Sequence, residues 1–205
     1  MKKPAILLLL FILFSFSIAD IAIGAEFNVN MLKLFKQDIK PATPLLPPDV
    51  TIGKKFEPGE GEQIGEVKIV EGIGYVIHQG ENIAYKAEVD LALYLGDTLI
   101  TQSDSRIGVG LYDNSSINLT SYSKLVLTNV VYDAKKKKRD STVNLIWGKA
   151  RFVVSKLGSD KTDYSVKTPV SVAGVKGSDF AIAVGPAELF AQVSKMEDFL
   201  HGLIL

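Results

Sequence analysis

The chain has 205 residues, with 23 lysines and arginines balanced by 23 aspartates and glutamates, and it contains no cysteine. This length fits one domain of ordinary size with a short appendage. The neutral balance argues against a nucleic-acid binder, because phosphate recognition usually requires a basic domain. Without cysteine there can be no disulfide, thiolate metal site or lipid-modified cysteine anchor, and His78 and His201 are too few for a polyhistidine metal centre. We therefore expect no cofactor and no metal.

Residues 1–25 have the pattern of a secretory signal peptide. Lys2 and Lys3 supply a positive start, and an almost unbroken apolar run follows over residues 5–19. The run is shorter than the roughly 20 residues that a membrane-spanning helix needs. We expect cleavage in the small-residue stretch that contains Ala22, Gly24 and Ala25. The mature chain is then predicted to be exported, with no membrane span.

Residues 26–64 are predicted to form a linker rich in proline and glycine. Prolines 41, 44, 47 and 48 remove backbone donors and favour an extended, polyproline-like chain. The stretch 53–65 adds glycine, proline and lysine, with few side chains to bury. A spacer is the favoured interpretation, and a proline-rich recognition segment is the alternative.

From residue 65 to residue 184 the sequence alternates between apolar and polar side chains with a period of two. Such alternation is typical of strands with one face in a core. Turn signals separate the runs at residues 95–97, 113–116, 147–149 and 157–160. No long helical pattern lies between them, so we predict a single all-β domain of short strands in an antiparallel or coiled arrangement. A β-solenoid-like variant stays open, because the sequence has no clean repeat period.

A few residues in this region could support chemistry, and for each one a structural role is the favoured interpretation. Trp147 could be a sugar-stacking platform, but a packed or strand-end tryptophan is more common. The basic run 135–139 could attract phosphate, but it has no interleaved aromatic residues and fits a solvated hairpin loop better. His78 falls on the polar phase of its strand, with no recognisable nucleophile motif. Asp104 and Asp113 could form a carboxylate pair, although nothing in the sequence sets their separation.

Short motifs follow one another in this domain in segments 74–76, 95–101, 105–115, 145–152 and 164–181. In this order they resemble the FecR-type domain, and the resemblance covers about 110 residues, 72–184. The last segment resembles the family's signature of Thr-Pro followed by Gly-Val-basic-Gly and a later Phe. The matching positions are Gly96, Asp97, Thr101, Asp113, Gly148, Thr168, Pro169, Gly174, Val175, Lys176, Gly177, Ser178, Asp179 and Phe180.

These motif residues read as structural rather than catalytic. Gly96 and Asp97 suit a turn in which the aspartate caps nearby amides. Thr168 and Pro169 suit a strand start or a sheet edge, since proline cannot donate to a ladder. The glycines at 174 and 177 suggest a bend or a close chain crossing. An anion-binding loop is the alternative, but the strand–loop–helix context of phosphate loops is missing.

The resemblance also implies a place in the bacterial envelope. Regulators of this family have a cytoplasmic tail that binds a sigma factor, a membrane span and a periplasmic domain that receives a signal. This chain opens with a signal peptide instead, so we expect no sigma-factor-binding tail and a stand-alone exported protein in the periplasm or at the cell exterior. Residues 185–205 have helical spacing, which predicts a short C-terminal helix or an altered end of the reading frame.

The sequence therefore predicts a non-enzymatic FecR-domain protein of the envelope that binds or signals through another macromolecule. The expected partner is an envelope protein or a glycan, and not a nucleic acid. The alternative from another class is a protein that acts on or binds cell-envelope polysaccharide, because coiled β folds often carry carboxylate sites on one face.

Overall fold

A computed structural model describes residues 37–133, 135, 138–156 and 162–186 of the chain. The predicted signal peptide and nearly all of the predicted C-terminal helix lie outside these described residues. Within them the chain forms thirteen strands and no helix, so the prediction of an all-β domain is confirmed. In particular, the described part of the chain has no helix long and apolar enough to cross a membrane.

The strands form where the sequence alternates. In β7 (Arg106–Leu111) and β8 (Ser115–Leu119), the side chains of Ile107, Val109 and Ile117 are buried. The intervening positions of β8 are only partly buried, as a period of two requires. Because successive side chains point to opposite faces, each such strand supplies one apolar row to the core.

All thirteen strands are connected, and the sheet has two arms that share β10 (Lys138–Val154). The first half of β10 pairs with β9 and β11, and the second half pairs with β8 and β13. Pairing is antiparallel except between β1 and β4 and between β10 and β11. The first arm also holds β1 (Thr51–Ile52), β4 (Ile83–Lys86), β3 (Gly74–Ile77), β6 (Thr98–Thr101), β9 (Lys124–Asp133), β11 (Thr162–Lys167) and β12 (Val172–Val175). The second arm holds β5 (Ala92–Tyr94), β2 (Gln63–Glu71), β7, β8 and β13 (Ser178–Val184).

Strand β10 passes from one arm to the other at Gly148. Its backbone has φ 86°, a left-handed conformation that favours glycine. A Cβ at this position would collide with the carbonyl oxygen of Tyr122 and with Ser123 Oγ. Ser123 Oγ in turn accepts a hydrogen bond from Lys149 N at 2.9 Å and donates one to Lys149 O at 3.0 Å. Gly148 therefore allows β10 to bend at the point where the Ser123 hydroxyl contacts its backbone.

One apolar cluster fills the space between the two arms. It joins Leu99, Leu125 and Leu145 of the first arm to Ile117 and Phe152 of the second, together with further buried residues of both. The ring of Phe152 stacks on the ring of Phe180 of β13, with centroids 5.2 Å apart. Trp147 is outside this cluster and only partly buried, at the bend of β10.

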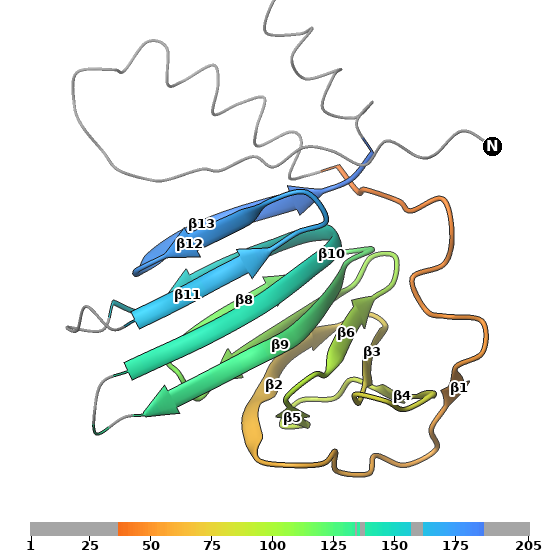
Figure 1. The fold of residues 1–205 in the computed structure, drawn as a ribbon. Helices are drawn as coiled ribbons and strands as arrows, with labels where there is room; N and C mark the ends of the chain where they lie inside the picture. The colour runs from red at the N-terminus through yellow and green to blue at the C-terminus, as the bar shows by residue number, and fades with distance from the viewer. Residues whose placement is uncertain (1–36, 134, 136–137, 157–161, 187–205) are drawn as a thin grey trace, which may run out of the picture.

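Residues 37–59, which we call the strap, run along the outside of the β-domain before β2 begins (orange in Figure 1). Their only strand is the two-residue β1, which pairs with the outer side of β4. Leu45, Leu46 and Val50 of the strap pack against a small cluster formed by Ile77, Ala84 and Ile100. The strap thus lies against the domain over its described length, while the boundary of the linker at residue 64 stays a prediction.

Candidate functional site

At several points of the interface between the strap and the β-domain, side chains of the domain donate hydrogen bonds to backbone carbonyls of the strap. Lys149 Nζ donates to Gln37 O at 2.5 Å, and Trp147 Nε1 donates to Ile39 O at 2.8 Å. A longer contact of 3.5 Å joins Lys124 Nζ to Leu45 O. A carbonyl is present at every residue, so these hydrogen bonds do not themselves depend on which side chains the strap carries.

Burial is strongest at the start of the strap. Ile39 and Lys149 are almost fully buried, with 3% and 1% of their surfaces exposed. Burial lowers the pKa of the Lys149 ammonium, and the charge of nearby Asp38 opposes this effect only in part. A lysine charge is therefore held in a desolvated place while the strap is docked.

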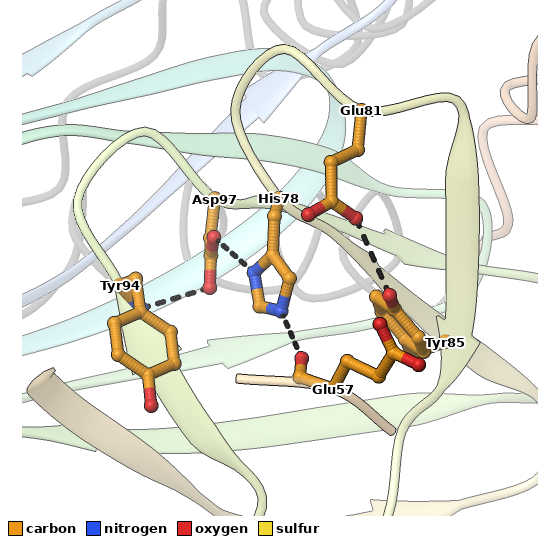
Figure 2. A network of polar contacts seen from close by, with 6 residues as sticks. All are labelled: Glu57, His78, Glu81, Tyr85, Tyr94 and Asp97. Atoms are coloured by element: carbon orange, nitrogen blue, oxygen red, sulfur yellow. Dashed lines mark hydrogen bonds and ion pairs between the residues drawn. The ribbon is translucent and has the colours of Figure 1, made fainter. Parts of the chain in front are cut away.

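Further along, His78 contacts the strap through a network shown in Figure 2. Its Nε2 atom lies 2.9 Å from the backbone oxygen of Glu57, and its Nδ1 atom lies 2.7 Å from Asp97 Oδ1. The second carboxylate oxygen of Asp97 accepts a hydrogen bond from Tyr94 N at 2.8 Å. His78 directly follows β3 and Asp97 lies in the turn before β6, so the network joins the strap to two parts of the first arm.

The geometry of this network sets the position of its protons. A carbonyl oxygen only accepts, so His78 Nε2 must carry a hydrogen that it donates to Glu57 O. A second proton lies between Nδ1 and Asp97 Oδ1, since two bare acceptors 2.7 Å apart would repel each other. Burial raises the pKa of Asp97, although the hydrogen bonds from His78 and from Tyr94 N oppose this shift. Both ring nitrogens are thus engaged, and the histidine holds chain segments together.

Aromatic rings enclose His78 and exclude water from it. The rings of Phe56, Tyr85 and Tyr94 have centroids 5.3 to 5.5 Å from the imidazole. Gly59 completes the enclosure, since a Cβ there would lie 2.9 Å from His78 Nδ1. The strap can approach the imidazole this closely only because position 59 has no side chain.

A second buried polar cluster surrounds Asp113, in the turn between β7 and β8. Asp113 Oδ1 accepts hydrogen bonds from Ser115 N, at 2.9 Å, and from Ser115 Oγ, and its Oδ2 accepts one from Ser141 Oγ at 2.7 Å. Arg139, which is 1% exposed, donates from Nη1 to the backbone oxygen of Asp113 and from Nη2 to that of Ser155. The carboxylate and the guanidinium therefore tie the β7–β8 turn to β10.

Tyr164 of β11 lies beside this cluster. Its ring is 5.6 Å from the guanidinium carbon of Arg139. Burial raises the pKa of the Tyr164 hydroxyl, and the charge of Asp113 adds to the shift. Among the buried side-chain atoms of the described residues, Arg139 Nε and Tyr164 OH have no hydrogen-bond partner.

The predicted motif residues are distributed over the domain and do not converge on one site. Gly96 and Asp97 form the turn before β6, where Gly96 has φ 84° and Asp97 caps Tyr94 N. Thr101 Oγ1 donates to Thr120 O and accepts from Ser123 N. These contacts, like those of Asp113 and Gly148, hold turns and strand bends in place.

The signature segment forms most of the β11–β12 hairpin and the start of β13. The Thr168 hydroxyl accepts a hydrogen bond from Ser171 N in the β11–β12 turn that also contains Pro169. Gly177 has φ 144°, and a Cβ there would lie 2.8 Å from Lys156 Cα, whereas Gly174 faces open space. The remaining motif residues divide between the core and the surface: Val175 and Phe180 are buried, Lys176 is exposed, Ser178 is partly buried, and Asp179 forms an exposed ion pair with Arg151.

Two expectations drawn from the sequence pattern are wrong. His78 is 3% exposed instead of lying on the polar phase, because the strap covers it. Arg139 ends the basic run but is buried under the β7–β8 turn, while Lys135 and Lys138 are exposed as expected. The sequence also gave no sign of the contacts made by Lys149 and Trp147, whose partners lie more than a hundred residues away.

Metal binding has no support in the described residues, where no three side chains of His, Asp or Glu gather to hold an ion. No carboxylate pairs with Asp104 or Asp113 among the contacts described for that same part of the chain; Asp104 is exposed in a turn with φ 50°.

Comparison with known proteins gives one match. The family model described as FecR protein matches residues 97–195, which begin at the Asp97 turn and include every strand from β6 to β13. Neither the curated proteins nor the solved structures yield a match. The bend at Gly148 and the turn at Gly177 both lie inside the matched range. Residues 97–195 are therefore a FecR-type domain, as the order of the motifs predicts.

Proposed function

We propose that this protein is a non-enzymatic, exported module of the cell envelope that acts by binding another macromolecule. A FecR-type domain indicates an envelope- or signalling-related regulator. Export rests on the signal-peptide pattern of residues 1–25, and the bound macromolecule is an envelope protein.

The observation that carries this proposal is how the reactive side chains are used. His78 has both ring nitrogens engaged, and both carboxylate oxygens of Asp113 accept hydrogen bonds from the domain itself. General acid–base catalysis needs such a group within reach of a substrate proton. Here these groups support the fold, which leaves the domain surface as the functional element.

Site-specific photocrosslinking in intact cells tests the partner directly. A photoreactive amino acid is placed at exposed apolar positions on four strands or turns, Ile69, Leu95, Val131 and Val172. We expect one protein partner to be captured from a subset of these positions, dependent on irradiation. Capture of small glycans alone, or of nothing at any position, would contradict the proposal.

Two further measurements complete the test. N-terminal sequencing of the protein from the envelope fraction should show removal of the first 24 or 25 residues. Hydrolysis or lyase activity on extracted envelope glycans should be absent. Turnover that a single Asp→Asn substitution abolishes would instead establish the polysaccharide-acting alternative.

A further inference from the structure

The two parts of the strap are held in different ways. Residues 51–59 are held through the β1–β4 ladder, the hydrogen bond from Gly53 N to Ala84 O at 3.0 Å, and the contact of Glu57 O with His78. Residues 37–50 have no ladder. Within the part of the chain that the structure describes, their only backbone-to-backbone hydrogen bond joins Val50 N to Pro47 O.

Residues 37–50 are instead held by hydrogen bonds to their carbonyls, which any extended peptide has, and by apolar side chains, among them Leu45, Leu46 and Val50. Lys149, Trp147 and Lys124 donate to three of their carbonyl oxygens, and Ile39 supplies the one fully buried side chain. Four prolines remove N–H groups from this stretch and leave its carbonyls as acceptors. We call the surface formed by Lys124, Trp147 and Lys149 the strap-binding face.

Docking of residues 37–50 also has an energetic cost, the desolvation of a charged side chain. The ammonium group of Lys149 is desolvated beneath these residues, which lowers its pKa and disfavours its charged form. Release would return this charge to water, and a second extended peptide would offer the same carbonyl oxygens. Exchange of one extended segment for another therefore conserves the hydrogen bonds of the face, whereas simple dissociation does not.

We propose that residues 37–50 are an exchangeable, autoinhibitory occupant of the strap-binding face, which binds an extended, proline-containing segment of a partner protein in their place. The partner segment carries an apolar side chain at the position of Ile39, with acceptor carbonyls at the positions of Gln37 and Ile39. Residues 51–59 stay docked during the exchange and keep the strap attached. This inference rests on the proposed function, because it names the kind of protein segment that is bound.

A peptide-exchange experiment on the full chain tests the proposal. The probe is a fluorescently labelled peptide with the sequence of residues 37–50, and binding is measured by fluorescence anisotropy. The variant Ile39→Asp loosens the chain's own strap without altering the face. We expect this variant to bind the probe at least tenfold more tightly than the unmodified chain does.

Matched variants identify the face as the place of binding. Ala42→Asp adds the same charge at an exposed strap position and should bind the probe like the unmodified chain. Adding Lys149→Met or Trp147→Phe to Ile39→Asp should weaken binding at least tenfold, because each removes a donor to a carbonyl. A probe that itself carries Ile39→Asp should not bind.

Two outcomes would overturn the proposal. One is a folded Ile39→Asp chain, with cooperative unfolding, that does not bind the probe. The other is an Ile39→Asp chain that fails to fold, since an exchangeable strap must be able to leave. Failure of the proposed function looks different: the probe would bind, but crosslinking in cells would capture no protein. Capture that is equal for the unmodified chain and for Lys149→Met would keep the proposed function and overturn this inference.

Discussion

Two buried aspartates have the same local role, capping a turn, but lie in different surroundings. Asp97 and Asp113 each cap a turn by accepting a backbone N–H, from Tyr94 and from Ser115. Asp97 belongs to what we call the strap cluster, formed with His78, Tyr94 and Glu57 O. Asp113 belongs to the hairpin cluster, formed with Ser115, Ser141, Arg139 and Tyr164.

The difference lies in where the partners come from. The hairpin cluster is built from strands and turns that the sheet already holds together, around β10. The strap cluster needs a segment that precedes the domain, and it contains an imidazole that must keep a proton toward that segment. The same turn-capping residue type thus supports a contact within the sheet in one place. In the other place it supports a contact with the strap that needs a proton on His78 Nε2. Four comparisons of variants can break or sharpen this contrast.

The largest effect is expected at the hairpin cluster. Asp113→Ala removes the acceptor of three hydrogen bonds in a fully buried place, so we expect the free energy of unfolding to fall by about 4 kcal/mol. Chemical denaturation measures this change. Asp140→Ala, at an exposed position of the same region, is the control and should change stability by less than about 0.5 kcal/mol. Similar effects for the two variants would contradict the role given to Asp113.

The next prediction compares two glycines, one in each region, at which an added Cβ would meet a neighbouring atom. Gly177→Ala combines φ 144° with a close contact to the backbone of Lys156, two residues after the end of β10, so we expect a loss of about 3 kcal/mol. Gly59→Ala meets only side chains and lies in the strap, which can shift, so about 1 kcal/mol is expected there. Gly174→Ala faces open space and serves as the control in thermal unfolding. A larger loss for Gly59→Ala than for Gly177→Ala would reverse the contrast.

A smaller effect, dependent on pH, is expected at Asp97. Its pKa is raised in the folded state, so folding favours the protonated carboxyl group, and this contribution is lost as pH rises through the raised pKa. The free energy of unfolding should therefore decline between about pH 4 and neutrality more steeply for the unmodified chain than for Asp97→Asn. At neutral pH the substitution itself should cost about 1 kcal/mol, since the amide oxygen can still accept from Tyr94 N.

Denaturation curves at several pH values, recorded for both chains, give the comparison. Subtracting the curve of one chain from that of the other removes the contribution of the groups that the two chains share. Parallel pH profiles would show that the proton of the strap cluster does not contribute to stability.

The smallest effect is expected at Tyr164. Its buried hydroxyl has no hydrogen-bond partner, so Tyr164→Phe removes a desolvated polar group and keeps the ring over Arg139. We expect stability to stay equal or to rise by up to about 1 kcal/mol, as measured by thermal unfolding. A loss of more than about 1 kcal/mol would show that the hydroxyl contributes a favourable interaction to the hairpin cluster.

Local sequence signals determined much of this protein. The period of two predicts strands because strand side chains alternate between core and solvent, and residues such as Ile107, Val109 and Ile117 lie where that rule places them. The Gly96–Asp97 turn follows from local conformational preferences, and the ordered motifs identify the FecR-type domain. Each of these inferences needs only neighbours along the chain.

Only the tertiary structure decided which polar side chains are buried and what they bind. His78 and Arg139 are buried because the strap and the β7–β8 turn cover them, and Lys149 contacts a residue 112 positions earlier in the chain. Such partners meet only when the two arms and the strap pack together, and a sequence pattern records no distance between them. Alternation therefore determined the fold class, whereas the candidate site depends on long-range packing that puts donors of the domain opposite carbonyls of the strap.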